Sequence, residues 1–110
     1  MPITYEDFEK VDIRTGVITA VEDFARARNP SYRVQVDFGE EVGSRRSSVQ
    51  ATNYSKDELI GMQVIGVVNF PPKNVAGFLS EVLILGVDGR DGQLSLLTPS
   101  RDAELGARMY

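Results

Sequence analysis

The sequence predicts an all-β domain with very little helix. Short apolar or β-branched runs of roughly four to eight residues, each bounded by turn-forming residues, are typical of strands, and several occur here. Residues 32–38 alternate between apolar and polar side chains, as a strand with one buried face does. Two short segments, residues 4–7 and 55–58, have helix-capping patterns, and helices this short must dock on other elements to be stable.

The N-terminal part of the chain is expected to hold a short helix and one long strand. Thr4 is a candidate N-cap, and Asp7 completes the pattern of a capping box. Residues 10–24 form the strand candidate, in which Gly16 interrupts the apolar pattern. A glycine inside a long strand often marks a bulge or a sharp bend. We therefore expect the first strand to bend at Gly16.

The middle of the chain predicts two strands followed by a helix. The alternating residues 32–38 form the second strand. Its buried face is expected to consist of Tyr32, Val34, Val36 and Phe38. A turn at residues 39–43 leads to a third strand at residues 45–52, which is polar along much of its length. The capping-box pattern at residues 55–58, with Gly61 as a terminator, predicts a short helix before the fourth strand.

The fourth and fifth strands are expected at residues 64–68 and 82–85, which are apolar on both faces. Residues 71–72 are both proline, and they end the fourth strand because proline has no N–H for the ladder. Gly77 and Ser80 mark the return of the chain to the sheet. The connection is therefore expected to present polar side chains at a rim of the sheet, namely Asn69, Lys73, Asn74 and Ser80.

The C-terminal part predicts a hairpin turn at residues 88–92, a strand at residues 93–98 and a short terminal strand at residues 105–110. An OB-fold, which is a partly open Greek-key barrel, has five main strands and one short helix between the third and the fourth. The predicted elements follow this order. The chain is thus expected to form a single domain over residues 1–110, with short N- and C-terminal extensions.

The composition excludes several classes of site. The chain has no cysteine and no histidine, which excludes disulfides, thiol or histidine-based catalytic triads, and zinc held by these residues. No carboxylates have the spacing of a calcium loop. We therefore expect no enzyme activity, no catalytic residue, no metal and no cofactor. Since no apolar run approaches roughly 18 residues and the N-terminus lacks signal-peptide features, we expect a cytoplasmic protein without membrane insertion.

The charge distribution is uneven. The net charge is −4 and the pI is near 4.8, which argues against a strongly electrostatic nucleic-acid binder. Residues 26–46 nevertheless hold five arginines against three acidic residues. The arginines are Arg26, Arg28, Arg33, Arg45 and Arg46. A local basic patch on an acidic protein is one interpretation of this distribution.

Two motifs resemble a known family. Residues 69–80 contain Asn, Pro-Lys, Gly and Ser at the spacing found in the tRNA-binding domain of some methionyl- and phenylalanyl-tRNA synthetases. Val-Asp-Ile-Arg-x-Gly at residues 11–16 and the long motif at residues 68–83 resemble the CsaA group of this family, small stand-alone bacterial proteins associated with chaperoning and export. The resemblance implies an OB-fold that binds unfolded or presecretory polypeptide and has a tRNA-binding type of surface.

The sequence also departs from the tRNA-binding pattern. Residues 29–32 lack the RNA-contacting lysine of that family, and Leu83 replaces its methionine. These departures, with the acidic pI, imply weak tRNA binding. Two hypotheses follow: a non-enzymatic, CsaA-like export chaperone, or a tRNA-binding module acting in trans with aminoacyl-tRNA synthetases or free tRNA.

The candidate binding residues have side chains that suit an RNA or a polypeptide ligand. Positive charges suit phosphate, amides suit base edges, aromatic rings suit stacking and an apolar rim suits peptide. They are Arg33, Arg45, Arg46, Asn53, Asn69, Phe70, Lys73, Phe78, Ser80 and Leu83. Structural alternatives stay open for most of them. The arginines suit solvated or edge positions of strands, the aromatic rings suit a core, and Asn69 and Ser80 suit hydrogen bonds that fix the loop backbone.

The ends of the chain predict a homodimer. A partly open barrel leaves strand edges exposed, and the terminal segments are apolar without an obvious place in a five-stranded barrel. The expected interface residues are Ile3, Tyr5, Phe8, Leu105, Met109 and Tyr110. Members of the family are described as dimers, which agrees. The alternative is that both ends fold back on their own barrel.

Overall fold

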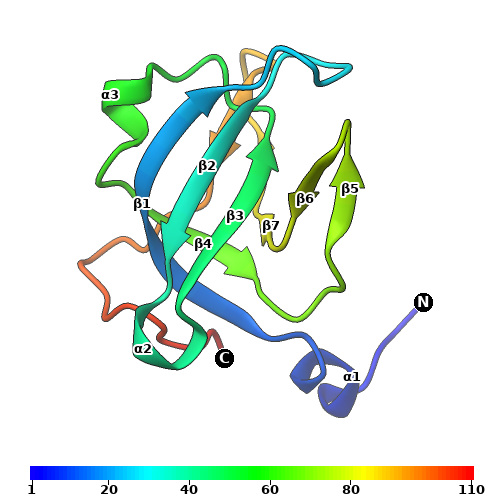
Figure 1. Ribbon diagram of the computed structural model, residues 1–110. Helices are drawn as coiled ribbons and strands as arrows, with labels where there is room; N and C mark the ends of the chain where they lie inside the picture. Colours follow the sequence, from blue (N-terminus) through cyan, green and yellow to red (C-terminus); the bar gives the residue numbers. More distant parts are fainter.

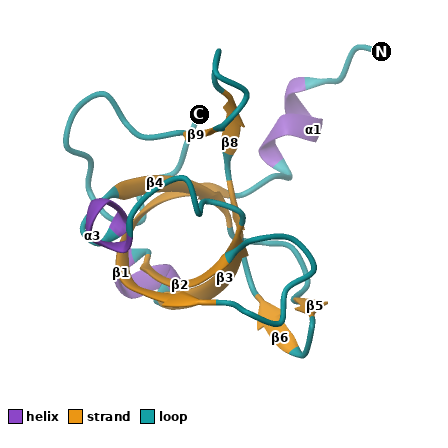
Figure 2. Ribbon diagram, turned by 90° about the horizontal axis from the view of Figure 1, so that it is seen from above, coloured by secondary structure: helices purple, strands orange, loops and turns teal.

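A five-stranded antiparallel sheet, curled into a barrel, forms the centre of the computed structural model, which describes all 110 residues (Figure 1). The strands are β1 (Ile13–Asp23), β2 (Tyr32–Asp37), β3 (Ser44–Val49), β4 (Gln63–Val67) and β7 (Leu83–Ile84). They pair in the order β3-β2-β1-β4-β7. Figure 2 looks down the barrel, whose strands form a ring. The predicted all-β, OB-type barrel is confirmed.

The long strand β1 belongs to both sides of the barrel. Its first half, Ile13 to Val17, pairs with β4, and its second half, from Val17 to Asp23, pairs with β2. The pairing with β2 shifts register between Ile18 and Ala20. The bulge therefore lies two to four residues after Gly16, which itself pairs regularly with Val64. A bend of β1 at Gly16 stays a prediction.

Gly16 is required for packing. A Cβ atom built there would lie 2.6 Å from Cγ1 of Val36 and 2.8 Å from Cδ1 of Phe38. These distances are shorter than van der Waals contact allows. The glycine thus lets β1 pass directly over two of the most deeply buried side chains of β2 and its C-terminal end.

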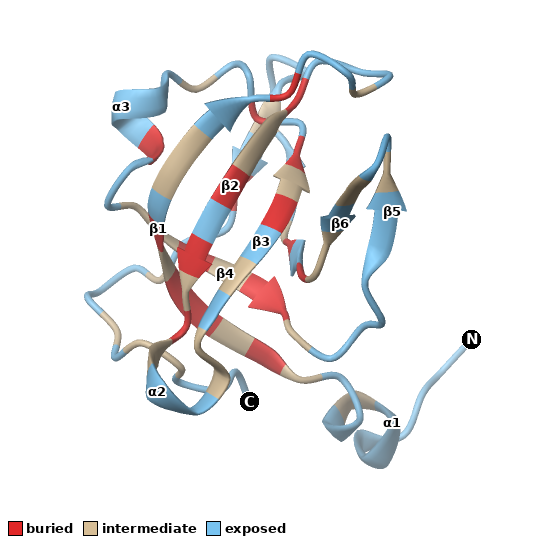
Figure 3. Cartoon of the chain, in the orientation of Figure 1, coloured by how far each residue is buried: buried red, intermediate tan, exposed pale blue.

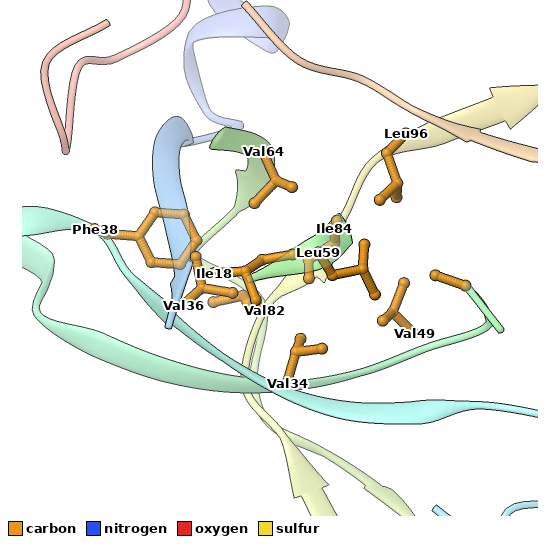
Figure 4. Close-up of a cluster of buried hydrophobic side chains, with 11 residues drawn as sticks. Ile18, Val34, Val36, Phe38, Val49, Leu59, Val64, Val82, Ile84 and Leu96 are labelled. Atoms are coloured by element: carbon orange, nitrogen blue, oxygen red, sulfur yellow. The ribbon is translucent and has the colours of Figure 1, made fainter. Parts of the chain in front are cut away.

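The core fills the barrel with aliphatic side chains and one aromatic ring (Figure 4). The alternation predicted for residues 32–38 is confirmed, because Val34, Val36 and Phe38 are all buried while Gln35 is exposed. Tyr32 is half-buried and packs against the cluster. The eleven buried members are Ile18, Val34, Val36, Phe38, Val49, Ala51, Leu59, Val64, Val82, Ile84 and Leu96.

Three short helices lie outside the barrel: α1 (Tyr5–Glu9), α2 (Gly39–Val42) and α3 (Lys56–Leu59). Both predicted capping boxes form, at the starts of α1 and α3. Helix α3 lies between β3 and β4 as predicted, and its Leu59 is fully buried. The turn predicted after β2 contains α2, a single helical turn. None of the helices has the length and apolar character needed to cross a membrane.

The connection between β4 and β7 is a hairpin rather than the predicted polar loop. Strands β5 (Lys73–Val75) and β6 (Phe78–Ser80) pair with each other outside the barrel, beside β3 (Figure 1). Ala76 and Gly77 form the tip with positive φ angles of 49° and 85°. The Asn74 side chain accepts a hydrogen bond from the Gly77 N–H at 2.8 Å. Gly77 therefore forms a turn and does not mark a return to the main sheet.

The C-terminal part contains a second hairpin, β8 (Gly86–Asp88) and β9 (Leu94–Leu96), around the predicted turn. The terminal strand predicted at residues 105–110 is reduced to one bridge between Arg14 and Arg108. Backbone hydrogen bonds nevertheless join this segment to β1. The amide of Thr15 donates to the Ala107 carbonyl at 3.0 Å, and the amide of Met109 donates to the Ile13 carbonyl at 2.7 Å.

Candidate polypeptide and RNA interface

A groove of about 530 Å³ lies between the β1–β2 loop, the end of β3 and the β5–β6 hairpin. Phe70, Pro71, Val75 and Leu83 form its apolar part. Its polar part consists of Arg28, Asn29, Ser31, Ser48, Gln50, Lys73, Ser80 and Glu81. Phe70 is 53% exposed and Leu83 is 49% exposed. Large apolar side chains exposed along a hollow are typical of surfaces that bind an apolar partner.

The residues that follow β6 attach this part of the chain to β3. The amide of Glu81 donates to the Arg46 carbonyl at 2.8 Å, and the Glu81 carboxylate accepts from the Arg46 amide at 2.9 Å. Ser80 Oγ accepts from the Ser48 amide at 3.1 Å, and Ser47 Oγ donates to the Val82 carbonyl at 2.8 Å. These bonds bridge the gap between β3 and β7, so the Ser-Glu-Val part of the long motif closes the barrel.

A cluster of alternating arginine and phenylalanine side chains lies near the tip of the hairpin. We call Phe24, Arg33, Arg46 and Phe78 the arginine–phenylalanine cluster. The Arg33 guanidinium lies 5.6 Å from the ring centre of Phe24 and 5.8 Å from that of Phe78. The Arg46 guanidinium lies 5.2 Å from the ring centre of Phe78. The two rings meet edge to face at 5.5 Å.

Seven of the ten predicted binding residues therefore fall into two groups. Phe70, Lys73, Ser80 and Leu83 line the groove. Arg33, Arg46 and Phe78 belong to the arginine–phenylalanine cluster. The prediction that Arg33 faces away from the core holds, but its side chain packs against the rings of Phe24 and Phe78 and is only partly exposed.

Arg45, Asn53 and Asn69 lie apart from both groups. Arg45 is on the same side of β3 as the buried Ser47, opposite Arg46. The Asn53 amide donates to the Leu94 carbonyl at 3.0 Å, near the β8–β9 hairpin.

The Asn69 side chain holds the start of β1. Its oxygen accepts from the Asp12 amide at 3.0 Å, and its nitrogen donates to the Lys10 carbonyl at 2.8 Å. The oxygen and the nitrogen of the amide are therefore both hydrogen-bonded to backbone groups. This agrees with the structural interpretation of Asn69 from the sequence, in which its side chain fixes the backbone.

The β1–β2 loop contributes to both groups, although none of its residues was among the predicted binding residues. Arg28, Asn29 and Ser31 line the groove, and Phe24 completes the cluster. The predicted fold could have indicated these loop residues, because ligands of OB-folds contact the loops that adjoin the second and third strands. No periodicity marks such loop residues.

Arg14, in the first motif, is the centre of a partly buried ion network, in which the Glu41 side chain is exposed. Its side chain is 12% exposed and donates to Asp12 at 2.6 Å, to the Gly106 carbonyl at 3.0 Å and to Glu41 at 3.3 Å. The hydrogen bonds to Asp12 and Glu41 raise the pKa of Arg14 above its ordinary value. This residue joins β1, α2 and the C-terminal segment, so the first motif has a structural role.

The apolar ends of the chain lie together. Tyr5, Phe8, Val11, Met109 and Tyr110 line a hollow of about 210 Å³. Helix α1 has no buried residue, and Tyr5 is 68% exposed (Figure 3). Of the other two predicted interface residues, Ile3 is exposed on the N-terminal side of α1, whereas Leu105 is half-buried and its carbonyl oxygen lies close to Gly39.

No group of three or more acidic residues is placed to hold a metal ion.

A small barrel with a helix between its third and fourth strands, and with a groove beside its second and third strands, defines an OB-type binding domain. Residues 13–108 match the family described as "putative tRNA binding domain", so the chain belongs to this family. It is 37% identical over 108 residues to the methionine–tRNA ligase of Thermococcus onnurineus, with 97% of this chain but only 14% of the ligase covered.

Solved structures of chaperones match over the whole chain. The crystal structure of the CsaA chaperone protein from Picrophilus torridus has a TM-score of 0.94 and 50% identity, covering 99% of this chain and 100% of that one. The chaperone CsaA from Bacillus anthracis has a TM-score of 0.92 and 44% identity, with both chains covered completely. The predicted resemblance to CsaA is confirmed.

Proposed function

We propose that this protein is a non-enzymatic, cytoplasmic chaperone that binds unfolded or presecretory polypeptide in the groove beside the β5–β6 hairpin. The observation that supports this most is the pair of exposed apolar side chains, Phe70 and Leu83, on a hollow with polar walls. The similarity to two proteins named as CsaA chaperones agrees with it.

The size of the apolar surface suits weak, reversible binding. Complete burial of a phenylalanine or leucine side chain contributes about 1.5–3 kcal/mol. Phe70 and Leu83 are each only about half exposed in the free protein, so their remaining burial contributes about 1.5–3 kcal/mol together, before the cost of ordering the bound segment. A binding free energy of about 4 kcal/mol corresponds to a dissociation constant of about 1 mM, so these two side chains alone give a weaker site than that. A chaperone that must release its client needs no tighter single site.

Two weak sites bind one ligand more tightly when they are held together. We propose that the protein is a homodimer formed through the exposed apolar surface of α1 and the C-terminal residues. A two-fold dimer would present two equivalent grooves. One polypeptide that occupies both grooves gains avidity without any new contact.

Binding of a fluorescein-labelled secretory signal peptide, measured by fluorescence anisotropy, tests the groove. Phe70→Ser and Leu83→Ser are each expected to weaken binding by about four- to tenfold, since each half-exposed side chain loses about 0.8–1.5 kcal/mol of apolar burial. Leu79→Ser is the matched control: Leu79 is 47% exposed on the neighbouring β5–β6 hairpin but does not line the groove. Equal effects of Leu79→Ser and Leu83→Ser would contradict the proposal.

The second candidate function is a tRNA-binding module that acts in trans with an aminoacyl-tRNA synthetase or on free tRNA. The family description and the match to one domain-sized part of a methionine–tRNA ligase favour it. The arginines of β2 and β3 favour it too, because OB-folds bind oligonucleotides on this face. Affinity for a tRNA transcript that is unchanged between low and high salt would contradict it, since phosphate contacts release counterions.

A further inference from the structure

We propose that the contact between Phe24 and Phe78 positions the two walls of the polypeptide groove relative to each other. Phe24 belongs to the β1–β2 loop and Phe78 to the β5–β6 hairpin. The inference rests on the proposed polypeptide-binding function, because it gives a positioning role in that function to two residues that do not line the groove.

The walls of the groove come from segments that are far apart in the sequence. The loop lines it with residues 27–29 and 31, and the hairpin lines it with residues 73, 75 and 80. The tip of the hairpin and residues 23–26 of the loop line a different hollow, which shares no residue with the groove. The width of the groove therefore depends on how the loop and the hairpin are held relative to each other.

Hydrogen bonds attach the hairpin to the barrel only at its base. Its two strands have three residues each and pair only with each other. The hydrogen bonds of residues 73–79 stay within the hairpin, and Ser80 and Glu81 make those to β3. Because an isolated two-stranded hairpin is at best marginally stable in water, the tip needs another contact to keep a fixed position.

The β1–β2 loop is hydrogen-bonded within itself. The Phe24 amide donates to the Ser31 carbonyl at 3.3 Å, and the Ala27 amide donates to the Phe24 carbonyl at 3.2 Å. The Ser31 hydroxyl donates to the Asn29 carbonyl at 2.9 Å. None of these bonds reaches the hairpin, so side-chain packing must join the two segments.

The two rings provide this packing. They meet edge to face with their centres 5.5 Å apart, which is a favourable arrangement of aromatic rings. Phe24 is buried and Phe78 is half-buried. The Arg33 guanidinium lies 5.6 Å from one ring centre and 5.8 Å from the other, in the range of cation–π attraction. Figure 1 shows the tip of the hairpin beside the loop.

Loss of either ring is expected to free the hairpin from the loop without removing any residue that lines the groove. A smaller fraction of the molecules then holds the two walls at the distance that suits a bound chain. The apparent affinity for polypeptide falls in proportion to that fraction. Because the two rings form one contact, removal of both should weaken binding no more than removal of one.

A double-mutant cycle measured with the labelled signal peptide tests this coupling. Phe24→Ala and Phe78→Ala are each expected to weaken binding by about three- to tenfold, and the double variant by the same factor. Phe78→Tyr keeps a ring and should bind like the wild type. If Phe24→Ala does not fold, Phe24→Leu takes its place, because leucine keeps an apolar side chain but has no ring.

Leu79→Ala is the matched control for the cycle. Leu79 is 47% exposed on the same hairpin, next to Phe78 in the chain. Its replacement should leave the affinity for the peptide within about twofold of the wild type.

Amide hydrogen exchange measures the link without any peptide, because exchange reports local opening of the structure. Phe78→Ala should speed the exchange of the hydrogen-bonded loop amides of Phe24 and Ala27. Phe24→Ala should likewise speed the exchange of the amides of residues 73–80. Leu79→Ala should leave the loop amides unchanged.

The inference would be overturned if the two losses of affinity multiplied in the double variant, or if Leu79→Ala weakened binding as much as Phe78→Ala. Loop amides whose exchange does not respond to Phe78→Ala would overturn it as well. Failure of the wild type to bind the peptide would instead contradict the proposed function, and this result is obtained before any variant is compared.

Discussion

The two CsaA-like motifs of this chain, one short and one long, have different roles in the structure. The first, residues 11–16, serves mainly the fold: Arg14 joins three segments, Gly16 gives the core room, and only Val11 is exposed, in the hollow between the chain ends. The second, residues 68–83, is divided between scaffold and surface. Ser80 and Glu81 close the barrel, while Phe70, Lys73 and Leu83 line the groove. A recognisable motif therefore indicates a family, but only the contacts of each residue indicate which part of it can bind a ligand.

The largest effect is expected from Gly16→Val. Its side chain would overlap Val36 and Phe38, whose atoms lie within 3 Å of the position that a Cβ atom at residue 16 would take. Overpacking of this kind costs about 1–3 kcal/mol, and we expect a value at the upper end of the range. Urea unfolding measures it. Thr19→Val on the same strand is the control, because Thr19 is exposed. A Gly16→Val protein as stable as the wild type would refute the packing role.

Arg14→Met is expected to have the next largest effect on stability. It leaves the Gly106 carbonyl without its side-chain donor and leaves Asp12 with only the longer ion pair to Arg108 at 3.6 Å, at a cost of about 1–3 kcal/mol. Because the pKa of Arg14 is raised in the folded state, its contribution is complete below its unfolded pKa and is lost only in strong alkali. The loss in Arg14→Met should therefore be the same at pH 6 and pH 9. Thermal unfolding of Arg14→Met and Arg101→Met at both values checks this.

The proposed dimer offers a third test, at the apolar ends of the chain. Phe8→Asp and Tyr110→Asp place a charge in the surface that the dimer would bury, and each should shift sedimentation equilibrium toward a single chain of 12.1 kDa. Point changes are preferable to removing residues 105–110, because that segment is hydrogen-bonded to β1. The proposed interface would be contradicted if the wild type had the mass of one chain, or if both variants kept the mass of a dimer.

The smallest effect on stability is expected from Lys73→Glu. Lys73 is exposed on the groove and makes no ion pair, so its replacement should change the unfolding free energy by about 0.5 kcal/mol or less. Binding of an acidic labelled peptide should weaken at the same time, because the charge at the groove is reversed. Anisotropy measures the binding of the peptide, and thermal unfolding of the same sample measures the stability of the fold. A large loss of stability with binding intact would make Lys73 a structural residue.

The sequence predicts the barrel well because its strands are periodic and its two capping boxes are local patterns. It predicts the binding surface only in part. Arg33, Phe78 and Phe24 meet through contacts between β2, the hairpin and the β1–β2 loop, and no local pattern encodes such a meeting. Asn69 has the chemistry of a ligand-binding residue, yet its amide holds backbone 57 and 59 residues away. The hairpin is hard to predict because its strands have only three residues each.

Mapping the signal peptide on the protein by amide NMR chemical shifts tests the central claim most directly. The account predicts that shifts concentrate on the groove, at residues 27–31, 48–50, 70–75 and 80–83, and that residues 11–16 do not respond. Shifts centred on residues 11–16 or on the β8–β9 hairpin, or no shifts at saturating peptide, would contradict it.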